Sequence, residues 1–163
     1  MTAPDAAVPA SAPRVVVLGA GPGGYAAAFH AADLGMAVTL VAPEEHPGGV
    51  CLYRGCIPSK TLLHVAAILS ETQRLSNRGI RFGTPHIDLG KLRDWKTSVV
   101  QKMAGGLGSL VRARNIRFVQ GRARFGGPKF LHVESENGDD PQRVDFDFAI
   151  VSTGSRPVTP AGF

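Results

Sequence analysis

Both cysteines of this chain lie in one short stretch, and they are the residues best suited to chemistry. Cys51 and Cys56 are five positions apart, in a predicted glycine-rich loop that starts at Gly48-Gly49 and runs into an apolar, helix-like segment from Ile57. Two thiols this close can form and break a disulfide by thiolate attack on sulfur. Cys56 directly precedes a predicted helix, and a helix N-terminus favours the thiolate form. The pair is therefore a candidate redox-active disulfide.

Two other interpretations of the cysteine pair have less support in the residues. A structural disulfide is uncommon in a cytoplasmic protein, and the chain has no further cysteine. A zinc site needs four ligands. His46 and His64 are close in sequence, but no second matching pair of ligands accompanies the cysteines. We therefore assign no metal ligands.

A glycine pattern of the dinucleotide-binding type precedes the cysteines. Gly19, Gly21 and Gly24 fit G-x-G-x-x-G, between a predicted strand at Arg14–Leu18 and a predicted helix at Pro22–Leu34. In this context the first glycine makes a tight turn, the second lets the backbone approach a pyrophosphate, and the third allows close packing of helix on strand. The pattern predicts a phosphate-binding site at the start of the helix.

The residue that should bind the ribose hydroxyls departs from this pattern. An acidic residue is expected at the end of the second strand, which we predict at Ala37–Val41. Ala42 occupies that position, and Glu44 and Glu45 follow it. We take Glu44 as the candidate ribose contact. The departure bears on dinucleotide affinity and leaves the predicted fold unchanged.

These site residues need a scaffold, and the hydrophobic pattern predicts one. Strands alternate with helices in the first half, which favours an α/β, Rossmann-like domain with a parallel sheet and crossover helices. Three short strands with an Asn137-Gly138 turn predict a small antiparallel β-meander near the end. The further predicted elements are helices at Ile57–Leu75 and at Leu92–Arg114, the second weakened by Gly105, Gly106 and Gly108, and strands at Ile116–Val119, Arg122–Phe125, Lys129–Val133, Arg143–Phe146 and Phe148–Val151.

Composition limits the class of protein. The chain has 163 residues, 44% of them hydrophobic, without a run near the roughly 20 apolar residues of a membrane span. Residues 1–13 lack the features of a signal or transit peptide, so we expect a flexible tail on a cytoplasmic protein. The net charge of +5 is concentrated between Lys91 and Arg117. Without interleaved aromatic residues this favours a solvated or partner-covered helix face, and we expect no nucleic-acid or membrane partner.

The stretch Gly48–Lys60 resembles the active-site signature of the class I pyridine nucleotide-disulfide oxidoreductases, which are flavin disulfide reductases. Its ending Ile57-Pro58-Ser59-Lys60, with Thr61-Leu62-Leu63-His64 after it, is most similar to the dihydrolipoamide dehydrogenases. Glutathione and mercuric reductases resemble it less at these positions. The resemblance extends in character from Val15 to Pro157 and implies an FAD-binding, Rossmann-like domain at 14–157, with 158–163 starting a linker to an NAD domain.

The resemblance implies a role for each matching residue. Cys51 would be the thiol that exchanges with the lipoyl disulfide, and Cys56 would lie beside the flavin as its charge-transfer partner. Lys60 would sit near the reactive nitrogen of the flavin, and the glycine pattern would hold the FAD pyrophosphate. The other expected cofactor contacts are Gly49, Val50, Ala123, Thr153, Gly154 and Ser155. Ser152 replaces the alanine that the family has before Thr153.

The implied function is a dihydrolipoyl dehydrogenase that passes electrons from dihydrolipoamide, through the Cys51-Cys56 disulfide and FAD, to NAD. The family's partners are the lipoyl groups of 2-oxoacid dehydrogenase complexes, and its members form homodimers. The chain lacks a second G-x-G-x-x-G and the family's His-Glu pair. We therefore expect a truncated, N-terminal part that does not turn over alone, with NAD bound outside this chain. The alternatives are a non-catalytic FAD-binding remnant and a disulfide reductase of the mercuric or glutathione type.

Overall fold

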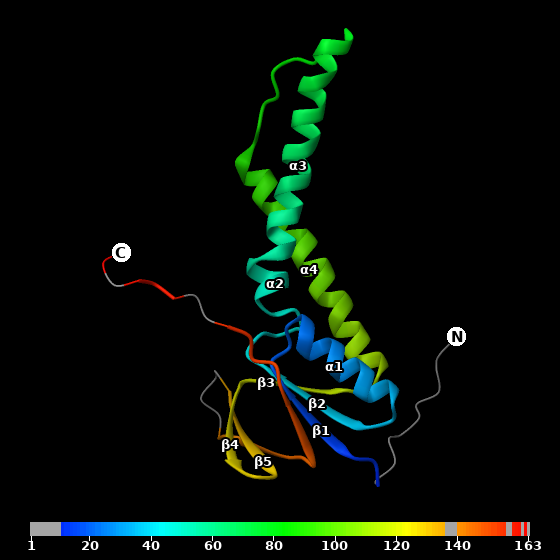
Figure 1. Cartoon of the computed structure of the whole chain (residues 1–163), viewed down its shortest axis with the longest axis vertical. Coiled ribbons are helices and arrows are strands. Elements are labelled where there is room, and N and C mark those ends of the chain that lie inside the picture. Colours follow the sequence, from blue (N-terminus) through cyan, green and yellow to red (C-terminus); the bar gives the residue numbers. More distant parts are fainter. Residues whose placement is uncertain (1–10, 136–139, 156–157, 161, 163) are drawn as a thin grey trace. The chain divides into compact units, whose positions relative to one another are not determined.

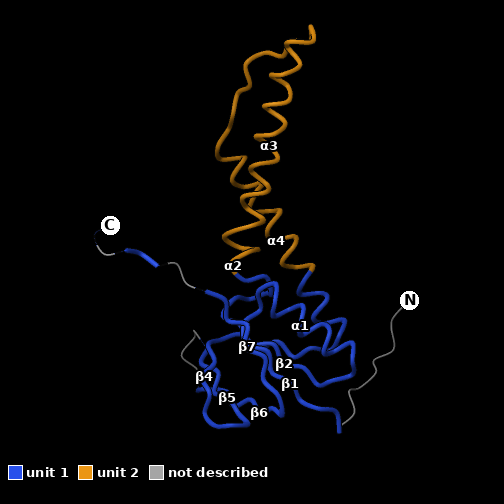
Figure 2. Tube along the Cα trace, in the orientation of Figure 1, with its two compact units in different colours: residues 1–49, 107–163 blue, residues 50–106 orange. Residues whose placement is uncertain are grey.

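The computed structural model describes residues 11–135, 140–155, 158–160 and 162. The chain divides into two compact units, which Figure 2 shows in different colours. The first, here called the sheet unit, comprises Met1–Gly49 and Leu107–Phe163. The second, called the helical unit, comprises Val50–Gly106. Each unit is described by itself. The expected tail at 1–13 falls mostly outside the described residues.

A four-stranded sheet forms the centre of the sheet unit, with strand order β3-β2-β1-β7. All three neighbouring pairs are parallel, and the register places Val16 opposite Thr39 and Ala149. The two central strands, β1 and β2, are mostly buried and rich in β-branched residues, as buried parallel strands are. The bounds of the four strands are β1 Arg14–Leu18, β2 Ala37–Ala42, β3 Arg117–Gln120 and β7 Phe148–Val151.

Helix α1, Pro22–Asp33, connects β1 to β2 and covers one face of the sheet (Figure 1). Pro22 starts it at a position where a missing N–H is harmless. Its buried residues Gly24, Ala28 and Ala31 are small, so the helix packs closely on the strands. The core on this side also contains Val15, Val17, Val38, Leu40, Val111 and Ile116.

The β-meander lies on the other face, as an antiparallel three-stranded sheet in the order β4-β5-β6. Its strands are β4 Arg122–Gly127, β5 Phe130–Glu134 and β6 Gln142–Asp145. Val16 and Leu18 of β1 contribute to a second core cluster with Leu131, Val133 and Val144 of the meander. The side chains of β1 thus alternate between α1 and the meander, which confirms the predicted α/β class with its added meander. The predicted Asn137-Gly138 turn lies outside the described residues.

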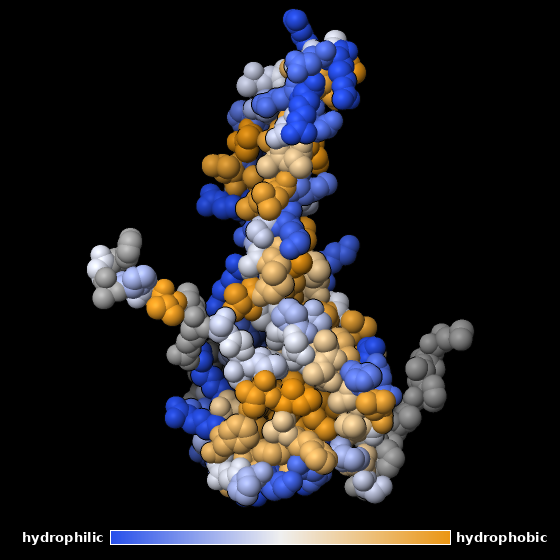
Figure 3. Space-filling model, viewed as in Figure 1, coloured by the Kyte–Doolittle hydropathy of each residue, from blue (hydrophilic) through white to orange (hydrophobic). Residues whose placement is uncertain are grey.

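The outer strand of the parallel sheet, β7, exposes apolar side chains. Phe148 and Val151 are each 63% exposed. An apolar groove of about 410 Å³ runs between this strand and α1, lined by Val15, Ala27, His30, Ala31, Leu34, Met36, Phe148 and Ile150. Figure 3 shows apolar side chains gathered on this face of the sheet unit. A contiguous apolar patch of this kind is typical of a surface that contacts other groups.

Three helices make up the helical unit: α2 at Gly49–Arg54, α3 at Cys56–Arg74 and α4 at Leu89–Ala113, whose last turns belong to the sheet unit. A 3-10 turn at Leu75–Arg78 follows α3. The expectation of a glycine-rich loop around Cys51 was wrong, because Gly49–Arg54 forms a short helix. Helix α4 continues without a break through Gly105, Gly106 and Gly108, and whether these glycines weaken it stays a prediction. Among the described residues, no helix has the length and apolar composition of a membrane span.

Candidate functional site

A pocket of about 410 Å³ opens at the carboxyl ends of the parallel strands in the sheet unit. Segments that follow β1, β2, β3 and β7 meet there. The lining residues are Leu18, Gly19, Val41, Ala42, Pro43, Gly121, Arg122, Ala123, Thr153, Gly154 and Ser155. In open α/β sheets, ligands bind in the crevice outside the carboxyl ends of the strands, where the strand order reverses. The order β2-β1-β7 puts this pocket at such a point.

Backbone hydrogen bonds hold the segments around the pocket in register. The Gly19 N–H donates to the Val41 carbonyl and the Gly121 N–H donates to the Ala42 carbonyl, both at 2.8 Å. The Gly48 N–H donates to the Ala20 carbonyl at 2.8 Å. Each bond joins a segment that follows a strand to a neighbouring segment, so the backbone at the pocket is fixed before any ligand binds.

The glycine pattern is required by close packing of backbone on backbone. A Cβ on Gly24 would collide with the Gly19 carbonyl, and a Cβ on Gly19, whose φ is +92°, would collide with the Ser152 carbonyl. A Cβ on Gly49 would lie 2.7 Å from the Gly21 Cα. By contrast, nothing lies within 4 Å of the position a Gly21 Cβ would take, so the backbone there is open to a ligand. The glycines therefore fit the pyrophosphate of a dinucleotide such as FAD.

Ser152 is a structural member of the site whose role the sequence did not reveal. Its N–H donates to the Leu18 carbonyl at 2.8 Å. Its hydroxyl lies 2.9 Å from the Leu18 carbonyl and 3.1 Å from the Gly19 carbonyl, either of which can accept its proton. The side chain thus fastens β7 to the glycine turn after β1. The sequence gives one indication of this role: Ser152 is polar, whereas the family that the chain resembles has alanine at this position.

At the end of β2, where a ribose contact is expected, the described residues that line the pocket include no carboxylate. Ala42 and Pro43 line it at the end of β2, and Arg122 lines it from the start of β4. Glu44 is half-buried and is not among the residues that line the pocket. Its assignment as a ribose contact stays a prediction. No feature of the sequence around Arg122 indicated that this residue would line the same pocket as Ala42 and Pro43.

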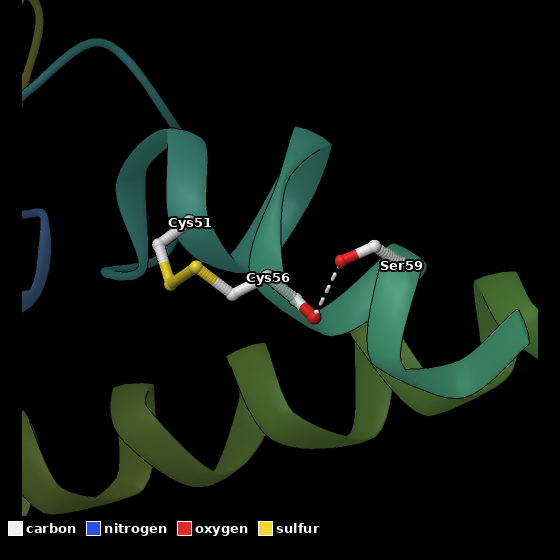
Figure 4. Close-up of a disulfide and its surroundings, with 3 residues drawn as sticks. All are labelled: Cys51, Cys56 and Ser59. Carbon is white, nitrogen blue, oxygen red and sulfur yellow. Dashed lines mark hydrogen bonds between the residues drawn. A yellow bond between two sulfur atoms is a disulfide. The ribbon is translucent and has the colours of Figure 1, made fainter. Parts of the chain in front are cut away.

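The two cysteines are joined by a disulfide in the helical unit. Cys51 lies in α2 and Cys56 is the first residue of α3, with their Cα atoms 4.8 Å apart. Figure 4 shows the bond and the Ser59 hydroxyl, which donates to the Cys56 carbonyl at 3.1 Å. Both cysteines are half-buried, so a small disulfide or dithiol can reach them. The N-terminus of α3 favours the thiolate of Cys56 once the bond opens.

The predicted site residues fall into two groups. Five of them line the pocket at the carboxyl ends of the parallel strands: Gly19, Ala123, Thr153, Gly154 and Ser155. Gly21, Gly24 and Gly49 lie in the backbone packing beside it. Cys51, Cys56, Val50 and Lys60 belong to the helical unit, where Val50 and Lys60 are exposed. The cofactor contacts assigned to these residues stay predictions.

An ion pair fastens the opposite end of the sheet. The Arg14 guanidinium lies 2.8 Å and 3.1 Å from the two carboxylate oxygens of Asp147, and the Arg14 N–H donates to the same carboxylate at 2.9 Å. The Asp147 N–H returns a bond to the Arg14 carbonyl at 2.9 Å. The hydrogen bonds from the Arg14 side chain and backbone hold the pKa of Asp147 well below its ordinary value. This pair anchors the start of β7 to the start of β1.

Comparison with known proteins places this arrangement in a family. Residues 13–163 match the pyridine nucleotide-disulphide oxidoreductase family. The chain is 47% identical over 145 residues to the dihydrolipoyl dehydrogenase of Vibrio parahaemolyticus, which covers 89% of this chain and 30% of that protein. It is 40% identical over 150 residues to the dihydrolipoyl dehydrogenase of Halobacterium salinarum, covering 91% of this chain and 31% of that protein. The chain thus spans about a third of the length of these relatives.

A solved structure gives the same result for the fold. The chain is similar to the HOCl-induced flavoprotein disulfide reductase RclA from Escherichia coli, determined as its Cu(II) complex. The TM-score is 0.72 at 25% identity, over 92% of this chain and 30% of that one. The parallel sheet, the separate antiparallel sheet and the cysteine pair agree with these matches. The chain belongs to the pyridine nucleotide-disulphide oxidoreductase family, whose relatives here include dihydrolipoyl dehydrogenases and a flavoprotein disulfide reductase.

Proposed function

We propose that this chain is the FAD-binding and disulfide-bearing part of a dihydrolipoyl dehydrogenase. The observation that carries the proposal is the presence, in one chain, of a glycine-walled pocket at the carboxyl edge of a parallel sheet and of the Cys51–Cys56 disulfide. The 47% identity to a dihydrolipoyl dehydrogenase supports the choice of substrate over a reductase of the glutathione or mercuric type.

The sheet unit would hold the cofactor. The open backbone at Gly21 and the N-terminus of α1 would receive the pyrophosphate, where free N–H groups and the helix dipole stabilise anions. Ala123 and the segment Thr153–Ser155 would contact the rest of the nucleotide from the sides of the pocket. FAD, when bound, supplies two-electron transfer between a dithiol and NAD.

The cysteines would exchange electrons with the lipoyl group. One thiolate of dihydrolipoamide attacks the Cys51 sulfur, and the Cys51–Cys56 bond breaks with its electron pair on Cys56. The second lipoyl thiolate then attacks the lipoyl sulfur of the mixed disulfide and releases Cys51. The lipoyl dithiol is oxidised to its disulfide and the protein disulfide is reduced to two thiols. The two protons that leave the substrate thiols are taken up, directly or through solvent, by the sulfurs of Cys51 and Cys56, so no proton is released overall.

The residues around the cysteines suit this direction of attack. Cys56, as the first residue of α3, is the better leaving group, because the helix N-terminus stabilises its thiolate. The Ser59 hydroxyl and the Thr61 hydroxyl donate to the carbonyls of Cys56 and Ile57 at 3.1 Å and 2.7 Å, which keeps the first turn of α3 in place. Lys60 adds a positive charge one turn after Cys56. Cys51 is thus the sulfur we assign to exchange with substrate.

The whole protein is proposed to act in the cytoplasm on the lipoyl groups of 2-oxoacid dehydrogenase complexes, with NAD as the final acceptor and a homodimer as its assembly. A second candidate is a flavin-binding remnant without catalysis. The specific observation in its favour is the missing carboxylate at Ala42, which removes an expected ribose contact.

The test measures binding of the cofactor and reaction with the substrate in separate samples. The purified chain is mixed with FAD and passed through a desalting column, and the retained flavin is measured per chain. A parallel sample without FAD receives dihydrolipoamide, and its protein thiols are counted after removal of small molecules. We expect retained flavin and two new thiols per chain. Retained flavin without new thiols would favour the remnant, and absence of both would contradict the proposal.

A further inference from the structure

At the corner of the pocket where the ribose of an adenine nucleotide would lie, the lining residues that the structure describes include a cation and no anion. This corner is formed by Ala42 and Pro43 at the end of β2 and by Arg122 at the start of β4. The Gly121 N–H donates to the Ala42 carbonyl at 2.8 Å, so Arg122 directly follows the residue that is tied to the end of β2. Among the described residues that line this pocket, Arg122 is the one with a charged side chain.

The guanidinium of Arg122 is available to a ligand. It is exposed, and within the part of the chain that the structure describes it has no ion pair or hydrogen-bond partner. Arg124, two positions along the same strand, differs, because its guanidinium lies 3.5 Å from the Glu134 carboxylate and it does not line the pocket. Glu134 lies opposite Arg122 in the register of β4 and β5, but its carboxylate pairs with Arg124. Arg122 and Arg124 share one face of β4, and of the two Arg122 lines the pocket without such a pair.

The charge at this corner decides which ribose a dinucleotide site prefers. A carboxylate at the end of the second strand accepts hydrogen bonds from the ribose hydroxyls and repels a phosphate there. An arginine nearby instead accommodates a 2′-phosphate, to which its planar fork donates two parallel hydrogen bonds. Ala42 removes the repulsion and Arg122 supplies the donors, so both changes act in the same direction.

We propose that Arg122 makes this pocket selective for adenine nucleotides whose ribose carries a 2′-phosphate, and that such nucleotides compete with FAD for it. The inference rests on the proposed function, because it assigns the adenosine end of FAD to the same pocket. It adds a ligand class and a specificity-determining residue that the family match does not supply. The absence of a carboxylate at Ala42 then marks an altered preference and not a lost site.

Two matched probes test the proposal: ADP-ribose and ADP-ribose 2′-phosphate, which differ only in the phosphate. Calorimetric titration of the whole chain at low salt should show about tenfold tighter binding of the phosphorylated probe, as a charge-assisted contact gives. The preference should shrink as salt rises, because Arg122 is exposed. The phosphorylated probe should also displace bound FAD at lower concentration than ADP-ribose does.

Three variants locate the effect. R122L should bring the affinities of the two probes together, and A42E should reverse the preference by restoring a carboxylate. R124L removes an equal charge from the same strand outside the pocket and should keep the preference of the wild type. Thermal melting of each variant reports whether it is folded. If R122L does not fold, A42E still tests the proposal, because it is expected to reverse the preference between the two probes.

The outcomes distinguish this inference from the proposed function. Retention of FAD with equal affinity for the two probes would overturn the selectivity and leave the flavin site standing. A preference for the phosphorylated probe that R122L keeps would also overturn it. Failure to retain FAD, with a preference that R122L abolishes, would support the selectivity while contradicting the flavin proposal.

Discussion

The two units of this chain depend on opposite properties of their residues. In the sheet unit, the pocket exists because Gly19 and Gly24 lack side chains, and a single added Cβ would meet a backbone carbonyl. In the helical unit, the proposed chemistry resides in the side chains of Cys51 and Cys56. Both are half-buried, Cys51 in the short helix α2 and Cys56 at the start of the longer helix α3. Recognition of a cofactor thus needs tight backbone packing, whereas exchange with a substrate needs two reactive sulfurs.

This difference predicts that the two functions can be lost separately. Replacing Cys51 or Cys56 should leave the pocket and its binding of FAD unaffected, because neither cysteine lines the pocket. A change at a pocket glycine should remove binding through the fold of the sheet unit and leave the cysteines chemically able to form their bond. The predictions below test that separation, beginning with the largest effect.

The largest effect should follow from C51S or C56S. Each variant has one sulfur left and can form no internal disulfide, so reduction by dihydrolipoamide should fall from two new thiols per chain to none. Binding of FAD should stay within about twofold of the wild type, a change of well under 1 kcal/mol. Thiol counting and flavin retention measure the two effects on the same samples.

The control for these variants is the reduced wild type, which also lacks the bond. Closing a loop this short stabilises a folded chain by about 2 kcal/mol at most, so reduced wild type and serine variants should melt at similar temperatures. A serine variant that melts with reduced wild type yet loses FAD would break the proposed separation, since it would show that the sulfur itself contributes to the pocket.

The second effect, on stability, should come from G24A. Its Cβ would collide with the Gly19 carbonyl, which is backbone and cannot move without shifting β1 from α1. We expect a loss of about 3 kcal/mol in the free energy of unfolding, with loss of flavin retention. The disulfide should still form. Denaturant unfolding and flavin retention give the measurement.

The matched control is G23A, one position earlier in the same helix. Nothing lies within 4 Å of the place where its Cβ would be. Alanine is the better helix former by about 1 kcal/mol, so G23A should be as stable as the wild type or slightly more stable. Equal destabilisation by the two variants would mean that helix α1 as a whole, and not its contact with the turn after β1, determines stability.

A smaller effect is expected from S152A, which restores the alanine of the resembling family. The variant removes the hydroxyl that bonds the Leu18 or Gly19 carbonyl at 2.9 Å and 3.1 Å. A single partly buried hydrogen bond contributes about 1 kcal/mol, so unfolding should become easier by about that amount or less. If chemical denaturation showed S152A to be more stable than the wild type, the hydroxyl of Ser152 would not stabilise the contact between the end of β7 and the turn after β1.

The smallest effect should be seen at Asp147, and it should depend on pH. Folding lowers the pKa of this carboxyl through hydrogen bonds from Arg14, so the pair adds stability above the ordinary value of 3.8 and loses it as the pH falls further. D147N should therefore melt a few degrees below the wild type at neutral pH, because the pair is exposed. The difference should fade in acid.

A control for D147N is D140N, which removes the same charge from an exposed aspartate outside the ion pair. Its melting temperature should follow that of the wild type from neutral to acid pH. A D147N difference that persists unchanged in acid would contradict the lowered pKa of Asp147 as the cause.

The elements with a strong periodic pattern could be predicted from the sequence, and the site geometry only in part. The β-branched runs at Arg14–Leu18 and Phe148–Val151 gave the strand bounds exactly as the structure has them. Helix α2 was missed, because Gly49 at its start argues for a loop when only local propensity is considered. Gly49 itself has a φ of +58° and its backbone packs against that of Gly21, which no local pattern reveals.

The roles of single side chains at the pocket were the hardest to predict. Ser152 and Arg122 act through segments far away in sequence: Ser152 bonds residues of β1, and Arg122 faces the end of β2. Their neighbours in sequence carry no sign of these contacts. The glycine pattern, by contrast, is local and has a fixed structural meaning, and the residues it marks lie together beside one pocket.

The central claim is that the cysteines of the helical unit exchange electrons with a flavin held by the sheet unit. Its most direct test is an anaerobic addition of dihydrolipoamide to the FAD-loaded chain, followed through the visible absorbance of the flavin. We predict that the flavin absorbance of the wild type falls and that the flavin of C51S stays oxidised. Flavin that is bound but unaffected in the wild type, or reduced equally fast in C51S, would contradict the claim.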